Sequence, residues 1–187
     1  SLTQVFIHPS VQIIEENAFK QCFALTRIAI PSSVNSIESN AFNKCVSLQE
    51  ISIPSSVTDF GNNVFEDCSS LNTIEILSKF DSIPLFTFKG CIALSKIIIP
   101  QTTRVIEASS FENCSSLKEI EIPSSVKSIG KNAFKDCHKL SMVKLNSPLN
   151  SLSESAFENC SSLNQIEITG ILSIEPSTFK GCSSLTD

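Results

Sequence analysis

Apolar and polar residues alternate over short stretches that recur along the whole chain at intervals of about 23 residues. In residues 114–137, where the pattern is most regular, Leu117, Ile120 and Ile122 are apolar and are separated by polar residues. This alternation predicts a strand with one buried face. Pro123 ends the strand, because proline cannot donate a hydrogen bond to a neighbouring strand.

The remainder of this unit predicts turns and a second apolar edge. Two serines come after Pro123 and supply turn hydroxyls, and the V-x-x-I spacing of Val126 and Ile129 indicates the second edge. The N-A-F-x-x-C segment that closes the unit at Cys137 has the three-residue spacing of a short helical turn. We therefore expect each unit to combine one longer strand with short turns, strands or helical pieces.

Cysteine marks the repeat. Each cysteine has a phenylalanine three residues before it and a leucine three residues after it, and the interval between cysteines is 23 residues except for a last interval of 22. The cysteines are Cys22, Cys45, Cys68, Cys91, Cys114, Cys137, Cys160 and Cys182. A period of this length is typical of leucine-rich repeats, in which each repeat forms one turn of a solenoid.

The unit resembles the BspA-like (treponemal-type) leucine-rich repeat, whose signature is A-F-x-x-C-x-x-L-x-x-I-x-I-P-x-x-V-x-x-I-G. The resemblance covers the whole chain, although the final glycine of the signature appears only at Gly61 and Gly130. It implies a leucine-rich-repeat solenoid, a β-rich α/β horseshoe, with a parallel β-sheet on the concave side and short turns, strands or helical pieces on the convex side.

We expect residues 1–187 to form a single domain of about eight repeats of 23 residues. Neither end carries the polar capping repeat that solenoids use for solubility. The chain is therefore interpreted as a segment of a longer array, and its exposed end repeats predict end-to-end self-association.

Composition and charge exclude two classes of partner. Lysine and arginine number 14 against 19 for aspartate and glutamate, giving a net charge of -5, opposite in sign to the basic surfaces that bind nucleic acid. The chain is 41% hydrophobic, but none of its apolar runs approaches the roughly 18 residues of a membrane span. We expect no nucleic-acid partner and no membrane insertion by this segment, and attribute the apolar content to the inward columns of the solenoid.

The eight cysteines are predicted to form a column of buried structural thiols. Stacked repeats lie about 4.8 Å apart with parallel Cβ vectors, whereas a disulfide needs Cβ atoms roughly 3.8 Å apart and turned toward each other. Free cysteine is also among the most buried residue types. Buried free thiols are therefore favoured over disulfides or metal ligands.

No catalytic, metal or cofactor site is predicted. His8 and His138 are five to six repeats apart, which is on the order of 27 Å at the spacing of stacked strands and too far for one site. His138 comes directly after Cys137, but the cysteine side chain should face the core, so a surface histidine is favoured over a Cys–His nucleophile. We expect a protein that is not an enzyme and that uses no cofactor.

The outward positions of the predicted concave sheet vary between repeats, and solenoids commonly bind partners on that surface. The candidate partner-binding residues are Glu50, Glu75, Lys96, Ile98, Glu119, Glu121, Met142, Lys144, Gln165 and Glu167. A solvated sheet explains any single one of these residues. As a set, they make this face the first candidate for protein recognition.

A second candidate surface is a lateral apolar patch in the irregular repeat at 77–90. Leu77, Leu85 and Phe86 depart from the repeat there, and the last two replace residues that are polar in most other repeats. Local repacking around Pro84 is the alternative explanation.

Two tripeptides match the acceptor sequence for N-glycosylation. They are Asn113-Cys114-Ser115 and Asn159-Cys160-Ser161. Each asparagine precedes a cysteine of the core column, and a structural role in capping or bridging a turn is the alternative. Glycosylation and a structural role both stay open at this point.

The resemblance also implies a function. BspA-like repeat proteins are cell-surface or secreted proteins of bacteria and protists, implicated in adhesion to host matrix proteins, host cells or other microbes. This implies a non-catalytic surface adhesin or surface antigen whose partner is a host surface or matrix protein. The alternative is an intracellular leucine-rich-repeat scaffold or regulatory protein that binds a signalling partner through the same face.

Overall fold

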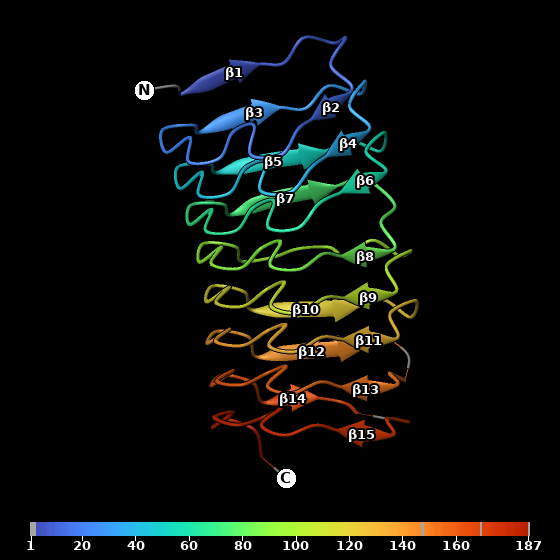
Figure 1. Cartoon of the computed structure of the whole chain (residues 1–187). Helices are drawn as coiled ribbons and strands as arrows, with labels where there is room; N and C mark the ends of the chain where they lie inside the picture. The colour runs from blue at the N-terminus through green and yellow to red at the C-terminus, as the bar shows by residue number, and fades with distance from the viewer. Residues whose placement is uncertain (1–2, 147, 169, 187) are drawn as a thin grey trace.

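The computed structural model describes residues 3–146, 148–168 and 170–186 and shows a solenoid of stacked turns (Figure 1). Each turn of the solenoid is one repeat, and we call it a rung. Most rungs contribute one longer strand and one two-residue strand, and the strands pair only in parallel among the described residues. The predicted leucine-rich-repeat solenoid with a parallel sheet is confirmed.

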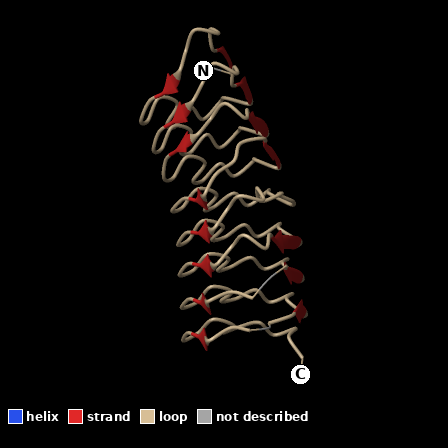
Figure 2. Ribbon diagram, turned by 90° about the vertical axis from the view of Figure 1, so that its right-hand side faces the viewer, coloured by secondary structure: helices blue, strands red, loops and turns tan. Residues whose placement is uncertain are grey.

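The longer strands, together with the two-residue β14, form two sheets along one wall of the stack, and the other two-residue strands form two sheets along another wall (Figure 2). The long-strand sheets contain β1 (Gln4–Phe6), β3 (Arg27–Ala29), β5 (Glu50–Ile53) and β7 (Thr73–Ile76), then β10 (Glu119–Ile122), β12 (Met142–Leu145) and β14 (Gln165–Ile166). The short-strand sheets contain β2 (Ile13–Ile14), β4 (Ser36–Ile37) and β6 (Asp59–Phe60), then β8 (Ser82–Ile83), β9 (Val105–Ile106), β11 (Ser128–Ile129), β13 (Ser151–Leu152) and β15 (Ser173–Ile174).

The register between rungs matches the sequence repeat. Glu119 pairs with Met142 across β10 and β12, a separation of one 23-residue repeat. Ser151 pairs with Ser173 across β13 and β15, so the one-residue deletion in the last interval is absorbed before β15. Equivalent residues of successive repeats therefore lie directly above one another, and each repeat position becomes a column.

The N-A-F-x-x-C segments form turns, and the described residues contain no helix. In residues 132–137, Asn132 and Asp136 have φ angles of 57° and 60°, a left-handed conformation that breaks a right-handed helix and that asparagine and aspartate tolerate better than most residues. The amides of Asn132, Phe134 and Asp136 donate to carbonyls of the next rung, while those of Ala133, Lys135 and Cys137 donate three residues back. Every backbone amide of the turn is thus satisfied, which explains why helical spacing produced no helix.

A continuous stack of phenylalanine rings fills the centre of the solenoid. The rings at the position three residues before each cysteine lie 5.1–5.8 Å apart between centroids, with interplanar angles of at most 22°. Phe42, Phe65, Phe88, Phe111 and Phe134 are fully buried. Near-parallel stacking of identical rings requires each rung to sit in the same place relative to its neighbour, so the stack holds the rungs in register.

Beside this stack, seven cysteines donate their thiol hydrogen to a phenylalanine carbonyl of the preceding rung. Cys114 Sγ lies 3.2 Å from Phe88 O, and Cys137 Sγ lies 3.2 Å from Phe111 O. The same contact, at 3.1–3.2 Å, is made by Cys45, Cys68, Cys91, Cys160 and Cys182. All eight cysteines are free, and seven are buried, whereas Cys22 is only half-buried.

Burial also controls the ionisation of these thiols. Removal from water raises the pKa of the Cys45 thiol to about 12, and it raises the pKa values of Cys68, Cys91 and Cys114 well above their usual range. Only the thiolate is strongly nucleophilic. The buried thiols of the column are therefore poor nucleophiles in the folded protein.

We expect a thiol reagent such as DTNB to label Cys22 before any other cysteine of the native protein. The remaining seven should react only on unfolding, because their thiols are buried and hydrogen-bonded. Time-resolved peptide mass spectrometry measures the order of labelling, and Cys22→Ser should remove the fast phase. Labelling of Cys114 in the folded protein as fast as that of Cys22 would contradict this arrangement.

The wall of long strands is interrupted once, between β7 and β10 (Figure 1). Residues 96–99 lie at the interruption and form no strand, and no backbone hydrogen bond involves any of these four described residues. Ile97 and Ile99 are nevertheless buried and Ile98 is exposed, so the alternation of a strand persists without its ladder. The interruption comes directly after the irregular repeat 77–90.

We expect the amides of residues 97–99 to exchange with solvent faster than those of the equivalent residues 120–122. Amides without a ladder hydrogen bond are open to water even where the side chains are packed. Hydrogen–deuterium exchange mass spectrometry of the native protein compares the two peptides directly. Equal protection in both would show that the wall is continuous.

Candidate protein-binding face

The outward side chains of the long strands form one exposed face, which we call the sheet face. In β5 and β10 the residues alternate between exposed and buried, as the sequence pattern predicts. All ten candidate partner-binding residues are exposed on this face. The structure gathers most of them into two hollows, one over each long-strand sheet.

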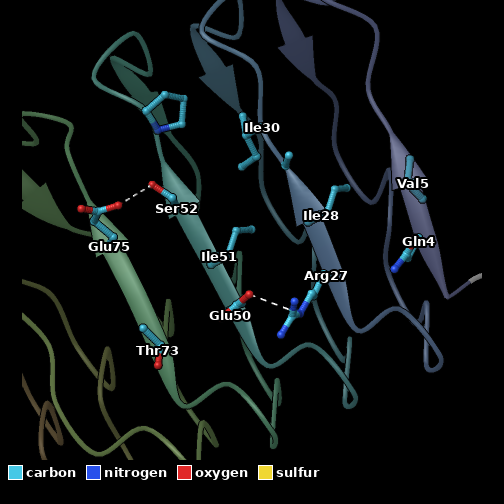
Figure 3. A pocket seen from close by; sticks show the side chains of 12 residues that line it. Gln4, Val5, Arg27, Ile28, Ile30, Glu50, Ile51, Ser52, Thr73 and Glu75 are labelled. Atoms are coloured by element: carbon cyan, nitrogen blue, oxygen red, sulfur yellow. Dashed lines mark hydrogen bonds and ion pairs between the residues drawn. The ribbon is translucent and has the colours of Figure 1, made fainter.

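The N-terminal hollow lies over β1, β3, β5 and β7 and has a volume of about 570 Å³ (Figure 3). Ala29 and Ser52 are neighbouring small residues within it. Arg27 Nε lies 3.2 Å from Glu50 Oε1, and Ser52 Oγ donates to Glu75 Oε2 at 3.0 Å. Of the residues in this hollow, sequence reasoning selected Glu50 and Glu75 and left out the ion-pair and hydrogen-bond partners that hold them.

The second hollow lies beside the interruption of the wall and has a volume of about 330 Å³. It brings together six of the predicted residues: Lys96, Ile98, Glu119, Glu121, Met142 and Lys144. Ile98 is 73% exposed and Met142 is 40% exposed, so two large apolar side chains lie open to solvent among charged groups. We call this second hollow the central hollow.

The charges around the central hollow are paired with one another. Lys144 Nζ lies 3.1 Å from Glu121 Oε1, and Lys96 Nζ lies 4.0 Å from Glu119 Oε1. Asn146 Nδ2 also donates to Glu121 Oε1 at 2.8 Å. Hydrogen bonds from Asn146 and Lys144, together with the lysine charge, lower the pKa of Glu121. Sequence reasoning did not identify Asn146, which stands where four of the eight repeats have proline.

Two predicted residues lie apart from these hollows. Gln165 and Glu167 are exposed at the C-terminal end of the same face, and neither lines the N-terminal or the central hollow. The sheet face therefore contains the whole predicted set, but its two hollows divide that set into separate groups.

The residues of the predicted lateral patch occupy different parts of their rung. Leu77 comes after β7 and is 53% exposed, whereas Leu85 and Phe86 come after β8 and are half-buried. Phe86 has a φ of 57° in the column that holds asparagine or serine in the other repeats, and Lys89 Nζ lies 5.3 Å from its ring centroid. Pro84 is buried beside them, and a single patch of all three residues stays a prediction.

A further column of charged residues, two positions before each of the last six cysteines, was missed by sequence reasoning. Its signal is an alternation of sign at intervals of one repeat: Glu66, Lys89, Glu112, Lys135, Glu158 and Lys180. Lys89 pairs with Glu112 at 3.4 Å, and Glu158 pairs with both Lys135 and Lys180 at 3.1 Å. The column runs along the turns, and we call it the turn ridge.

Glu158 is the most strongly held of these groups. Hydrogen bonds from Ser155, Lys135 and Lys180 lower the pKa of its carboxyl to about 2. The same contact with Glu158 raises the pKa of Lys135. A carboxyl whose folded pKa is depressed stabilises the fold above its unfolded pKa of about 4.3, and this contribution disappears as the pH falls through the folded value.

We expect Glu158→Gln to lower stability at pH 7 and to lower it progressively less between about pH 4.5 and pH 2, because the wild-type carboxylate is then protonated. Urea unfolding midpoints over this pH range measure the difference. Glu154→Gln is the matched control, since Glu154 pairs with Lys131 on the exposed surface, where an ion pair contributes little. A constant difference between Glu158→Gln and wild type at every pH would contradict the assignment.

Other chemistry on the described surface is sparse. The described residues contain no group of three histidine, cysteine or acidic side chains that could hold a metal ion, and no helix in the same ranges could cross a membrane. His138 Nδ1 lies 3.0 Å from the Asn159 carbonyl, and His8 Nδ1 lies 2.8 Å from Ser10 Oγ. Each histidine thus has a local partner and lies outside the N-terminal and central hollows.

Comparison with known sequences matches the chain to the family described as the BspA type leucine rich repeat region, with six copies over residues 1–117 and 81–187. A search of curated proteins gives no match.

Solved structures of three leucine-rich repeat proteins superpose on the chain. One from T. pallidum is 34% identical, with a TM-score of 0.80 over 86% of this chain and 78% of that one. One from Bacteroides ovatus is 26% identical, with a TM-score of 0.65 over 96% of this chain. A third, described as a leucine rich cell surface protein from Faecalibacterium prausnitzii, is 29% identical, with a TM-score of 0.62 over 88% of this chain. The chain spans only 58% and 52% of the last two proteins.

Proposed function

The chain belongs to the BspA-type leucine-rich repeat family, and on that premise we propose that it is a non-catalytic, protein-binding module of a microbial surface protein. Leucine-rich repeats generally bind proteins, and they do so on extended faces that stacked repeats create. We propose an adhesin or surface antigen whose partner is a host surface or matrix protein.

The central hollow supports protein binding more than any other feature. Exposed Ile98 and Met142 lie together among the charged residues of the central hollow, and large apolar side chains inside a charged rim are typical of interface centres. Glu121 and Lys144 pair with each other at 3.1 Å and form part of this charged rim. The partner should present an apolar side chain flanked by polar groups.

A surface location is supported by similarity alone. The related protein of F. prausnitzii is described as a cell surface protein, and the T. pallidum protein shows that the same repeat occurs in a bacterium. We extend the surface location to this chain as part of the proposal.

The test uses a pull-down of host surface and matrix proteins followed by affinity measurements with single variants. Ile98→Ser should weaken binding at least about fivefold, because truncating a side chain that is central to an interface costs more than about 1 kcal/mol. Ile92→Ser is the matched control: Ile92 belongs to the same repeat and is 44% exposed, but it lies in the turn after Cys91, away from the sheet face.

Reversal of Glu119, Glu121 and Lys144 together should weaken binding in the same assay, with thermal unfolding confirming that the fold is unchanged. Binding that survives both Ile98→Ser and this charge reversal would rule out the central hollow as the binding site. Capture of no host protein by the wild-type chain would count against the adhesin proposal itself.

A further inference from the structure

The asparagines of the two glycosylation acceptor sequences have nearly the same φ angle and different side-chain surroundings. Asn113 and Asn159 occupy the same repeat position, one residue before a buried cysteine, and their φ angles are 59° and 60°. The side-chain contacts that distinguish them come mainly from the rungs above and below.

The side chain of Asn159 is held within the fold. It is half-buried, and its Nδ2 donates to Asp136 Oδ1 at 2.8 Å. It lies over the backbone of Gly181, where an added Cβ would come within 2.4 Å of Asn159 Oδ1. The hydroxyl of this acceptor sequence is also engaged, since Ser161 Oγ donates to the His138 carbonyl at 3.4 Å.

The side chain of Asn113 is exposed. The residue at the same repeat position in the next rung is Asp136, whereas the corresponding residue for Asn159 is Gly181. Asn113 therefore cannot lie over a glycine as Asn159 does. Among the described residues, neither the Asn113 side-chain amide nor the Ser115 hydroxyl has a hydrogen-bond partner. Asn113 lines an open polar hollow of about 390 Å³ with Asp67, Lys89 and Glu112, which leaves space for a bulky polar group.

We propose that Asn113 is an acceptor for an asparagine-linked oligosaccharide and that Asn159 is a structural residue that carries none. In this modification, Nδ2 of Asn113 loses one proton and forms a C–N bond to the terminal sugar of an oligosaccharide, and the lipid diphosphate that carried the sugar departs. The proposal rests on the proposed surface location, because only exported chains meet the transferase.

The position of the glycan is compatible with binding at the sheet face. Asn113 lies in the turn before Cys114, next to Glu112 of the turn ridge, and none of the residues lining its hollow belongs to a long strand. A glycan there covers the turns and leaves the central hollow open. A glycan on Asn159 would instead displace the contacts with Asp136 and Gly181 and would disfavour the native packing.

The test is expression of the whole chain behind a secretion signal in a eukaryotic host, with glycopeptide mass spectrometry on the folded, secreted fraction. We expect a glycan on the Asn113 peptide and none on the Asn159 peptide. Ser115→Ala should abolish the modification while leaving Asn113 in place, and the matched variant Ser161→Ala should leave it unchanged. Enzymatic release of the glycan under native conditions should not lower the melting temperature.

An unmodified Asn113 in secreted, folded protein would overturn the inference, and so would a glycan on Asn159 in that fraction. Neither result bears on binding through the sheet face, which is measured separately with Ile98→Ser. Conversely, if the adhesin proposal fails, the expected difference in glycosylation between the two asparagines still holds, because this experiment supplies the secretion signal.

Discussion

Registered stacking of identical buried side chains is the constraint on which the rest of this structure depends. The phenylalanine rings stack at 5.1–5.8 Å, and seven of the thiols bond to a carbonyl of the rung before them, as Cys114 does with Phe88. A rung displaced by one residue would lose both contacts at once, and the buried and exposed side chains of its strand would exchange faces. The cysteine thus acts as a small apolar group that also donates a second hydrogen bond to a buried carbonyl, beside the one from a backbone amide.

The same register organises the surface. Because equivalent residues lie above one another, opposite charges one repeat apart become ion pairs, as Lys135 and Glu158 do on the turn ridge and Lys144 and Glu121 do on the sheet face. The N-terminal hollow contains the small neighbours Ala29 and Ser52, and the central hollow adjoins the interruption of the wall. The residues of the binding face therefore differ from repeat to repeat, whereas the core residues that position them are alike in each repeat.

The irregular repeat at 77–90 shows what happens where the chain departs from the repeat sequence. Residues 77–90 replace template residues with Leu77, Phe80 and Phe86, and Phe86 occupies a left-handed position that is strained for a bulky side chain. The long-strand wall is interrupted in the next rung, and the central hollow adjoins the interruption. The candidate binding site thus lies next to the least regular part of the solenoid.

The sequence by itself determined the period, the columns of the core and the exposed face, because each depends only on which residue recurs at a repeat position. It selected Ile98 and Met142 but not Asn146, and it treated Asn113 and Asn159 alike. Only the tertiary structure decided that residues 96–99 lack a ladder, that the turns are not helical, and that Asn159 lies over Gly181 while the Asn113 side chain is exposed. The physical reason is that these properties depend on the pairing of unlike residues in adjacent rungs, which no single repeat contains.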